Sequence, residues 1–202
     1  MIPWLSIVVP TIGRPSLARF MESASGHGVE IVLVADTHGD EYTADNDRSR
    51  ALFKDKATWI DYDAGYHAWG HPQRNEGMRH ATGEWMMFSQ DDNVLVSGAL
   101  QAIRTAIRQQ PYPRPLLFQV DTRSAGVVWK EPYLIERNID ADCIVVPNDS
   151  ARLGVWTDRF EGDYDFIKKT CDLWLDFVFC RRLISKRPDH RREIRELLEA
   201  AR

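Results

Sequence analysis

The fold of this 202-residue chain is decided by the stretch Pro72-Gln-Arg-Asn-Glu-Gly-Met-Arg-His-Ala-Thr-Gly-Glu-Trp-Met-Met-Phe-Ser-Gln-Asp-Asp-Asn93. Its first part, up to Ala81, predicts a helix, because proline suits a first helical turn and a glycine follows the last turn. The apolar run Glu84–Ser89 predicts a buried strand, which delivers four polar residues at its carboxyl end. A helix that leads directly into a buried strand is the repeating unit of an α/β protein.

The same alternation extends on both sides of that stretch. Further strands are predicted at Leu5–Pro10, Val29–Ala35 and Ala57–Asp61, and further helices at Pro15–Ser23, at residues 42–53 and at Gly98–Gln109. Strands separated by helices predict a doubly wound, mostly parallel sheet of the Rossmann-like kind. Ligands bind such sheets beyond the carboxyl ends of the strands, where Pro10, Asp36 and the pair Asp91 and Asp92 fall.

The second half of the chain has a different pattern. Arg114–Asp121, Gly126–Trp129 and Cys143–Val146 predict strands joined by turns, which indicates a smaller mixed sheet. A helix is predicted from Gly162 through Arg182, and a last amphipathic helix from Pro188 to the end of the chain. We expect one domain over residues 1–202.

Composition is that of a globular protein, with 44% hydrophobic and 28% charged residues. The net charge of -4 gives no general attraction for nucleic acid or anionic membranes. The segment Arg181–Arg195 nevertheless carries seven basic residues against two acids, so it has a charge of +5 and the remainder -9. Such a segment is either a solvated helix face or a surface for a phosphate-rich or acidic partner.

Cysteine usage and hydropathy predict the compartment. Cys143, Cys171 and Cys180 are odd in number and widely spaced, which is typical of free thiols in a reducing environment. The chain contains no basic leader and no run of the roughly 18 apolar residues that a membrane span needs. We therefore expect a cytoplasmic protein without a membrane span.

The polar turn after residue 89 offers only oxygen atoms as metal ligands. Asp91, Asp92 and Asn93 suit Mg²⁺ or Mn²⁺ rather than zinc, although two aspartates in such a loop can also form a solvated turn. Arg74, near the start of the preceding helix, is suited to clamp a diphosphate, or is an ordinary surface arginine.

Together these residues resemble the central signature of family 2 glycosyltransferases. That signature has a Gly-x-Pro-x-Arg-Asn-x-Gly segment, here starting at Gly70, then Ala-x-Gly-Glu, an apolar strand and an Asp-x-Asp motif. Ser6–Pro15 is similar to the first strand and nucleotide loop of the family, and Val32–Asp36 to its second strand. The resemblance is strongest from Ser6 to Ile107, and it implies the GT-A fold.

The resemblance implies a nucleotide-sugar donor on residues 1–110. Pro10, Thr11 and Arg14 would line the nucleotide pocket. Asp36 would bind the base, as in uridine recognition, so a UDP-sugar is the expected donor. Arg74 would contact the diphosphate or help to order the site.

The metal assignment follows from the same resemblance. Asp92 matches the last acid of the Asp-x-Asp motif and would ligate Mn²⁺ or Mg²⁺, while Asp91 would contact the donor ribose or sugar. Gln90 stands where the first acid usually is. Its amide can bind a ribose hydroxyl but adds no charge, so we expect a modest affinity for the metal.

Residues 111–185 would supply the acceptor side and the catalytic base. Asn138–Val146 resembles an Ile-Asp-Thr strand of the family, and the segment around Asp163 resembles the one that carries the base. Asp163 is the expected base, with Glu161 and Asp165 as alternatives, although Asp163 could merely cap the following helix. Trp156 would stack on an acceptor or pack in the core.

We therefore predict a metal-dependent, inverting glycosyltransferase whose acceptor is a hydroxyl on a saccharide, lipid-linked sugar, protein or modified DNA. Residues 186–202 would form a basic C-terminal helix. Two alternatives stay open. One is a nucleotidyltransferase acting on sugar phosphates, although the loop Pro10–Arg14 has only one glycine. The other is a catalytically inactive nucleotide-sugar-binding module, which Gln90 permits.

Overall fold

The protein, as seen in a computed structural model, is described over residues 2–38, 43–66, 68–122 and 126–188. The strands are β1 (Leu5–Thr11), β2 (Val29–Asp36), β3 (Thr58–Tyr62), β4 (Trp85–Phe88), β5 (Val94–Leu95), β6 (Leu116–Thr122), β7 (Gly126–Val128), β8 (Ile144–Pro147) and β9 (Val178–Lys186). They form one mixed sheet in the order β3-β2-β1-β4-β8-β6-β9-β5, with β7 paired to β6.

The first four strands of that order are parallel. β1 pairs with β2 from Leu5 opposite Val29 to Thr11 opposite Ala35, and β4 pairs with β1 on the other side. The carboxyl ends of β1, β2 and β4 therefore meet at one edge of the sheet. The antiparallel pairs begin at β8, so the parallel half predicted from the sequence and the mixed second half are both confirmed.

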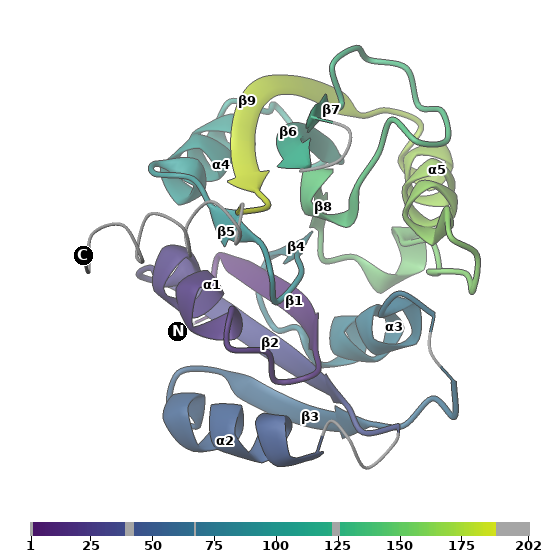
Figure 1. The fold of residues 1–202 in the computed structure, drawn as a ribbon. Coiled ribbons are helices and arrows are strands. Elements are labelled where there is room, and N and C mark those ends of the chain that lie inside the picture. The colour runs from purple at the N-terminus through teal and green to yellow at the C-terminus, as the bar shows by residue number, and fades with distance from the viewer. Residues whose placement is uncertain (1, 39–42, 67, 123–125, 189–202) are drawn as a thin grey trace.

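Five helices are described: α1 (Leu17–Ala24), α2 (Thr43–Phe53), α3 (His71–His80), α4 (Ala99–Arg108) and α5 (Gly162–Trp174). Because strand side chains alternate between faces, β1 contributes side chains to both layers of the core. Ile7 and Val9 pack with residues of α1 and α4, whereas Val8 lies in the cluster that includes α5. α3 and α5 thus lie on the face opposite α1 and α4, as Figure 1 shows.

The predicted length of the helix that begins at Gly162 is wrong. The helix expected from Gly162 through Arg182 ends at Trp174, and β9 follows it. Leu175 has φ 60, a left-handed conformation that terminates a helix, and the Asp176 carboxylate accepts a hydrogen bond from the Phe177 amide. The run after it is rich in aromatic and β-branched residues, which suit a strand beside β6.

The predicted C-terminal segment 186–202 also needs correction at its start. Lys186 is the last residue of β9 rather than part of a helix, and the helix expected beyond Pro188 lies outside the described residues. In the part of the chain that the structure describes, no helix is both long and apolar enough to cross a bilayer. The three cysteines are free, as expected.

Candidate active site

A pocket of about 360 Å³ opens at the carboxyl edge of the parallel strands. We call it the strand-edge pocket. Its lining includes all seven residues that the sequence assigned to donor binding: Pro10, Thr11, Arg14, Asp36, Arg74, Gln90 and Asp91. Segments that are up to 81 positions apart in the sequence are brought together there by the pairing of β1 with β2 and β4.

Asp91 lines this pocket and is only 2% exposed. Its Oδ1 accepts a hydrogen bond from Arg14 Nη1 at 2.7 Å, and its Oδ2 accepts from the Thr11 hydroxyl at 2.9 Å and from the Ile12 amide at 3.2 Å. Burial raises the pKa of the Asp91 carboxyl, and Arg14 opposes that rise. Asp91 therefore ties the loop after β1 to the turn after β4.

Arg74 is buried, at 3% exposure, rather than projecting as a surface arginine. Its Nη1 donates to the Trp69 carbonyl at 2.9 Å, and its guanidinium lies 5.0 Å above the ring of Trp156. Burial lowers the pKa of Arg74, against the effect of neighbouring carboxylates such as Asp142. Since arginine stays protonated in proteins, Arg74 is a fixed positive charge beneath the pocket.

Gly70 allows this packing. It has φ 79, and a Cβ atom there would lie 2.7 Å from Pro10 Cβ and 3.3 Å from Arg74 Nη1. Only glycine combines that backbone conformation with so close an approach. The Gly-x-Pro segment thus brings the start of α3 against the end of β1.

Asp92, the predicted metal ligand, is paired with an arginine. Its Oδ2 accepts a hydrogen bond from Arg187 Nη2, and its Oδ1 is buried without a hydrogen-bond partner. The oxygens of Asp91 are engaged, and Gln90 adds only an amide. Among residues 2–38, 43–66, 68–122 and 126–188, no three His, Cys, Asp or Glu side chains gather as a metal site. A resident Mg²⁺ or Mn²⁺ is held by one or two carboxylates together with waters and substrate phosphates. The carboxylates of Asp91 and Asp92 are already engaged by Arg14 and Arg187, so the donor set described here does not fit such an ion.

A second pocket, also about 360 Å³, lies beside the N-terminus of α5. We call it the α5 pocket. It shares Trp69, Arg74, Gln90 and Arg187 with the strand-edge pocket, so the two cavities have a common wall. Asp140 and Asp163 line its far side.

Asp163 has the electrostatics of a base. Burial and the nearby Asp140 carboxylate raise its pKa to about 7, although the Tyr164 amide and Arg74 act in the opposite direction. The Tyr164 amide donates to Asp163 Oδ1 at 2.7 Å, so the helix start orients the carboxylate. Gly162 lets α5 approach this site, since a Cβ there would lie 2.4 Å from His71 Nδ1.

The other predicted acids are held by an arginine. Asp165 accepts from Arg159 Nη1 at 3.1 Å and from the Thr157 hydroxyl, and Glu161 lies 3.6 Å from Arg159 Nη2. Glu161 still lines the α5 pocket. Asp163 lines the α5 pocket and has a raised pKa, which makes it the strongest candidate for proton transfer.

Trp156 is a core residue. It is 1% exposed and stacks on Phe166 with ring centroids 4.6 Å apart. Of the two roles that the sequence left open for Trp156, this burial favours packing in the core over stacking on an acceptor. Two exposed aromatic residues line the α5 pocket, Trp69 and Phe160, whose rings contact edge to face with centroids 5.6 Å apart.

Sequence reasoning missed Asp142, whose carboxylate is hydrogen-bonded to both sides of the turn after β4. Its fully buried carboxylate accepts hydrogen bonds from the Ser89 hydroxyl at 2.6 Å, the Asn93 amide at 2.8 Å and the Ser185 hydroxyl at 2.8 Å. Burial and Asp140 raise its pKa to about 7. The spacing of Asp140 and Asp142 was the one signal, and nothing in a single sequence links it to Ser185.

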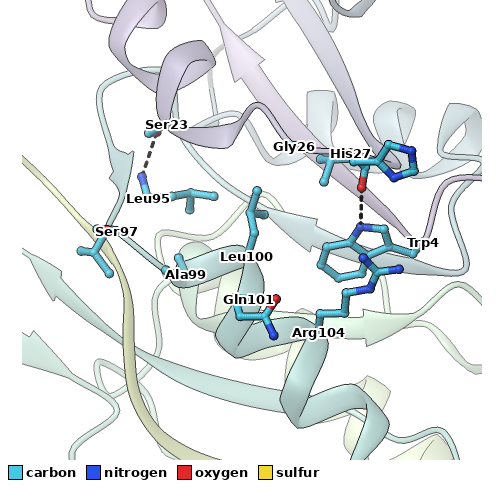
Figure 2. A pocket seen from close by; sticks show the side chains of 13 residues that line it. Trp4, Ser23, Gly26, His27, Leu95, Ser97, Ala99, Leu100, Gln101 and Arg104 are labelled. Carbon is cyan, nitrogen blue, oxygen red and sulfur yellow. Dashed lines mark hydrogen bonds between the residues drawn. The ribbon is translucent and has the colours of Figure 1, made fainter.

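A third cavity, of about 440 Å³, lies at the opposite edge of the sheet, before β1 and β2 begin. Figure 2 shows Trp4 donating to the His27 carbonyl at 3.2 Å, with Arg104 beside the indole. None of the described residues that line this cavity carries a carboxylate. It therefore differs from the other two pockets, which are lined by strand ends and acids.

No protein-family model and no curated protein matches the chain. Solved structures do. S. aureus TarS has a TM-score of 0.69 at 15% identity, over 96% of this chain and 38% of that one. TarS 1-349 in complex with UDP-GlcNAc has a TM-score of 0.66 at 16% identity, over 90% and 57%.

The mannosyltransferase PcManGT from Pyrobaculum calidifontis, in complex with GDP-Man and Mn²⁺, has a TM-score of 0.64 at 14% identity, over 91% of this chain and 56% of that one. The chain thus spans between about two fifths and three fifths of these proteins. At such identities the likeness concerns the fold. This chain therefore shares its fold with TarS and with a mannosyltransferase.

Proposed function

We propose that this chain is a glycosyltransferase, which moves a sugar from a nucleoside diphosphate donor to an acceptor hydroxyl with inversion. The observation that carries the proposal is a pair of pockets with a common wall, one of which holds a carboxyl group with a pKa of about 7. The UDP-GlcNAc bound by TarS and the GDP-Man bound by PcManGT support a donor of this class.

The donor would occupy the strand-edge pocket. Asp36 lies at the end of β2, and its Oδ1 accepts a hydrogen bond from the His38 amide at 2.9 Å, which orients the carboxylate. We expect Asp36 to bind the base of a UDP-sugar, with Pro10 and Thr11 along the nucleoside. Gln90 lines both pockets, and its amide suits a hydroxyl of the donor ribose or sugar.

Transfer would be a single displacement at the shared wall. The acceptor oxygen forms a bond to the anomeric carbon while the bond from that carbon to the diphosphate oxygen breaks. The hydroxyl proton passes to Asp163, whose pKa of about 7 suits a base at neutral pH. The fixed charge of Arg74 stabilises the negative charge that develops on the departing nucleoside diphosphate.

The α5 pocket favours a saccharide among the acceptor classes. Trp69 and Phe160 line it and are 59% and 63% exposed. Aromatic faces of this kind suit the apolar face of a sugar ring. Lipid-linked sugars, glycosylated proteins and modified DNA can present the same ring, and the fold does not choose among them.

The predicted metal dependence has one observation in its favour, the Mn²⁺ in the PcManGT complex. In the described site Asp92 Oδ1 is a buried carboxylate oxygen without a hydrogen-bond partner. The assay below is therefore run with and without Mn²⁺.

The test is to incubate the protein with UDP-glucose, UDP-galactose, UDP-GlcNAc and GDP-mannose and to measure release of the nucleoside diphosphate. Slow hydrolysis of one donor, accelerated by a saccharide acceptor, is the expected result. Pyrophosphate release from a nucleoside triphosphate and a sugar phosphate would instead identify a nucleotidyltransferase. Binding of a nucleotide sugar with no turnover of any donor would identify an inactive binding module.

A further inference from the structure

The wall between the two pockets carries an arginine that no sequence motif indicated. Arg187 follows β9 and lines both the strand-edge pocket and the α5 pocket. Its guanidinium is paired with Asp92, and its side chain is 48% exposed. If the proposed function holds, the diphosphate of the donor lies at this wall, next to Arg187.

Three contacts hold the backbone at this point. Lys186 pairs with Val94 of β5, the Ser185 hydroxyl donates to Asp142 at 2.8 Å, and the Arg187 amide donates to the Asp121 carbonyl at 3.0 Å. In Figure 1 the end of β9 comes down beside β5, next to the parallel strands. Arg187 is therefore delivered to Asp92 by a hydrogen-bonded sheet edge, so its position is set before any ligand arrives.

The charges around the turn favour an arginine over a divalent ion. Gln90 is neutral, and both oxygens of Asp91 accept hydrogen bonds from residues of the β1 loop. Asp92 is the remaining carboxylate, and Arg187 already neutralises it. A guanidinium has five N–H donors, so it can keep a bond to Asp92 and still offer a pair of donors to a phosphate.

We propose that Arg187, oriented by Asp92, provides the cationic contact to the donor diphosphate, so that the nucleotide binds without a divalent metal. This inference rests on the proposed function and deepens its donor site. Arginine recognises phosphate oxygens bidentately, and its charge is permanent. In this role it stabilises the leaving nucleoside diphosphate together with the buried Arg74.

The test is calorimetric binding of UDP and GDP in EDTA and in Mn²⁺. We expect the wild type to bind one nucleotide in EDTA, with less than about a threefold change on adding Mn²⁺. Arg187→Gln should weaken binding in EDTA about tenfold or more, since a charge-assisted contact is lost. Mn²⁺ should restore part of that loss, because Asp92 is vacated. Arg181→Gln, on β9 and 70% exposed, is the control and should bind like the wild type.

Asp92→Asn provides a second measurement if Arg187→Gln does not fold. Under the proposal this variant binds nucleotide in EDTA within about threefold of the wild type. Arg187 loses the partner that orients it, but the negative charge that competes with the diphosphate for its guanidinium is also removed. A wild type that binds only with Mn²⁺, and an Asp92→Asn variant that loses binding, would overturn the inference and leave the proposed function standing. A folded wild type that binds neither nucleotide under either condition would overturn the donor site itself.

Discussion

The two pockets differ in how their charges are compensated. In the strand-edge pocket, the charge of Asp91 is compensated by Arg14 at 2.7 Å and by a hydrogen bond from the Thr11 hydroxyl. In the α5 pocket, burial and the nearby acid Asp140 raise the pKa of Asp163 to about 7. Compensated charges hold a loop in place, whereas an uncompensated carboxylate takes up a proton near neutral pH. Under the proposed function, the strand-edge pocket would bind the donor and the α5 pocket would carry out the proton transfer.

Removing the base should have the largest effect. Asp163→Asn keeps the shape of the side chain but cannot accept the proton, so we expect the transfer rate to fall by a factor of about 10² to 10⁴. Nucleotide binding should change by less than about twofold, because Asp163 lines only the α5 pocket. Initial rates and calorimetry on the same preparation separate the two quantities. Asp172→Asn, an exposed acid on the same helix, is the control. Full turnover by Asp163→Asn would eliminate the base assignment.

The packing of the strand-edge pocket can be disturbed at Gly70, which lines it. Gly70 and Gly98 both have φ 79, but a Cβ on Gly70 would lie 2.7 Å from Pro10, whereas one on Gly98 meets nothing within 4 Å. Alanine at position 98 should cost only the backbone strain, about 1 kcal/mol. Alanine at position 70 should cost a further 1 to 3 kcal/mol, roughly the cost of overpacking, and should weaken nucleotide binding. Urea unfolding of both variants measures the difference, and equal losses would contradict the packing account.

The pH dependence should follow Asp163. Below a pKa of about 7 the carboxyl is protonated, so the transfer rate should fall about tenfold per pH unit on the acid side. Stability has the opposite sign, because the folded state keeps this proton at pH values where the unfolded chain has lost it. The contribution is present below the unfolded pKa near 4 and is lost as the pH rises through about 7.

Asp163→Asn isolates this contribution, since the buried Asp142 also has a pKa raised to about 7. Between pH 5 and pH 8 the wild type should lose more unfolding free energy than the variant, as measured by urea titration at both pH values. A variant with an unchanged pH dependence would show that other groups dominate.

How much the sequence predicted also differs between the two regions. Strand ends such as Pro10, Asp36 and Asp91 could be placed at one edge because parallel strands fix where their carboxyl ends lie. β9 could not, because only three residues lie between the end of α5 and its start, and no glycine or proline among them marks the end of the helix. The roles of Arg187 and Asp142 could not be predicted either. Their roles arise from pairing of β9 with β5 and β6, and such long-range contacts leave no local pattern.

The smallest effect on the reaction is expected at Trp156, behind the common wall. The ring is 1% exposed, stacks on Phe166 and supports Arg74. Trp156→Phe keeps an aromatic ring but loses volume, so it should cost about 1 to 2 kcal/mol of unfolding free energy, mostly from packing. The indole Nε1 has no hydrogen-bond partner, so no bond is lost with it. The acceptor KM should stay within about twofold, whereas Trp69→Ala, at the exposed mouth, should raise it by about tenfold. A large rise in KM for Trp156→Phe would mean that this ring reaches the acceptor after all, and the α5 pocket would extend deeper than its present wall.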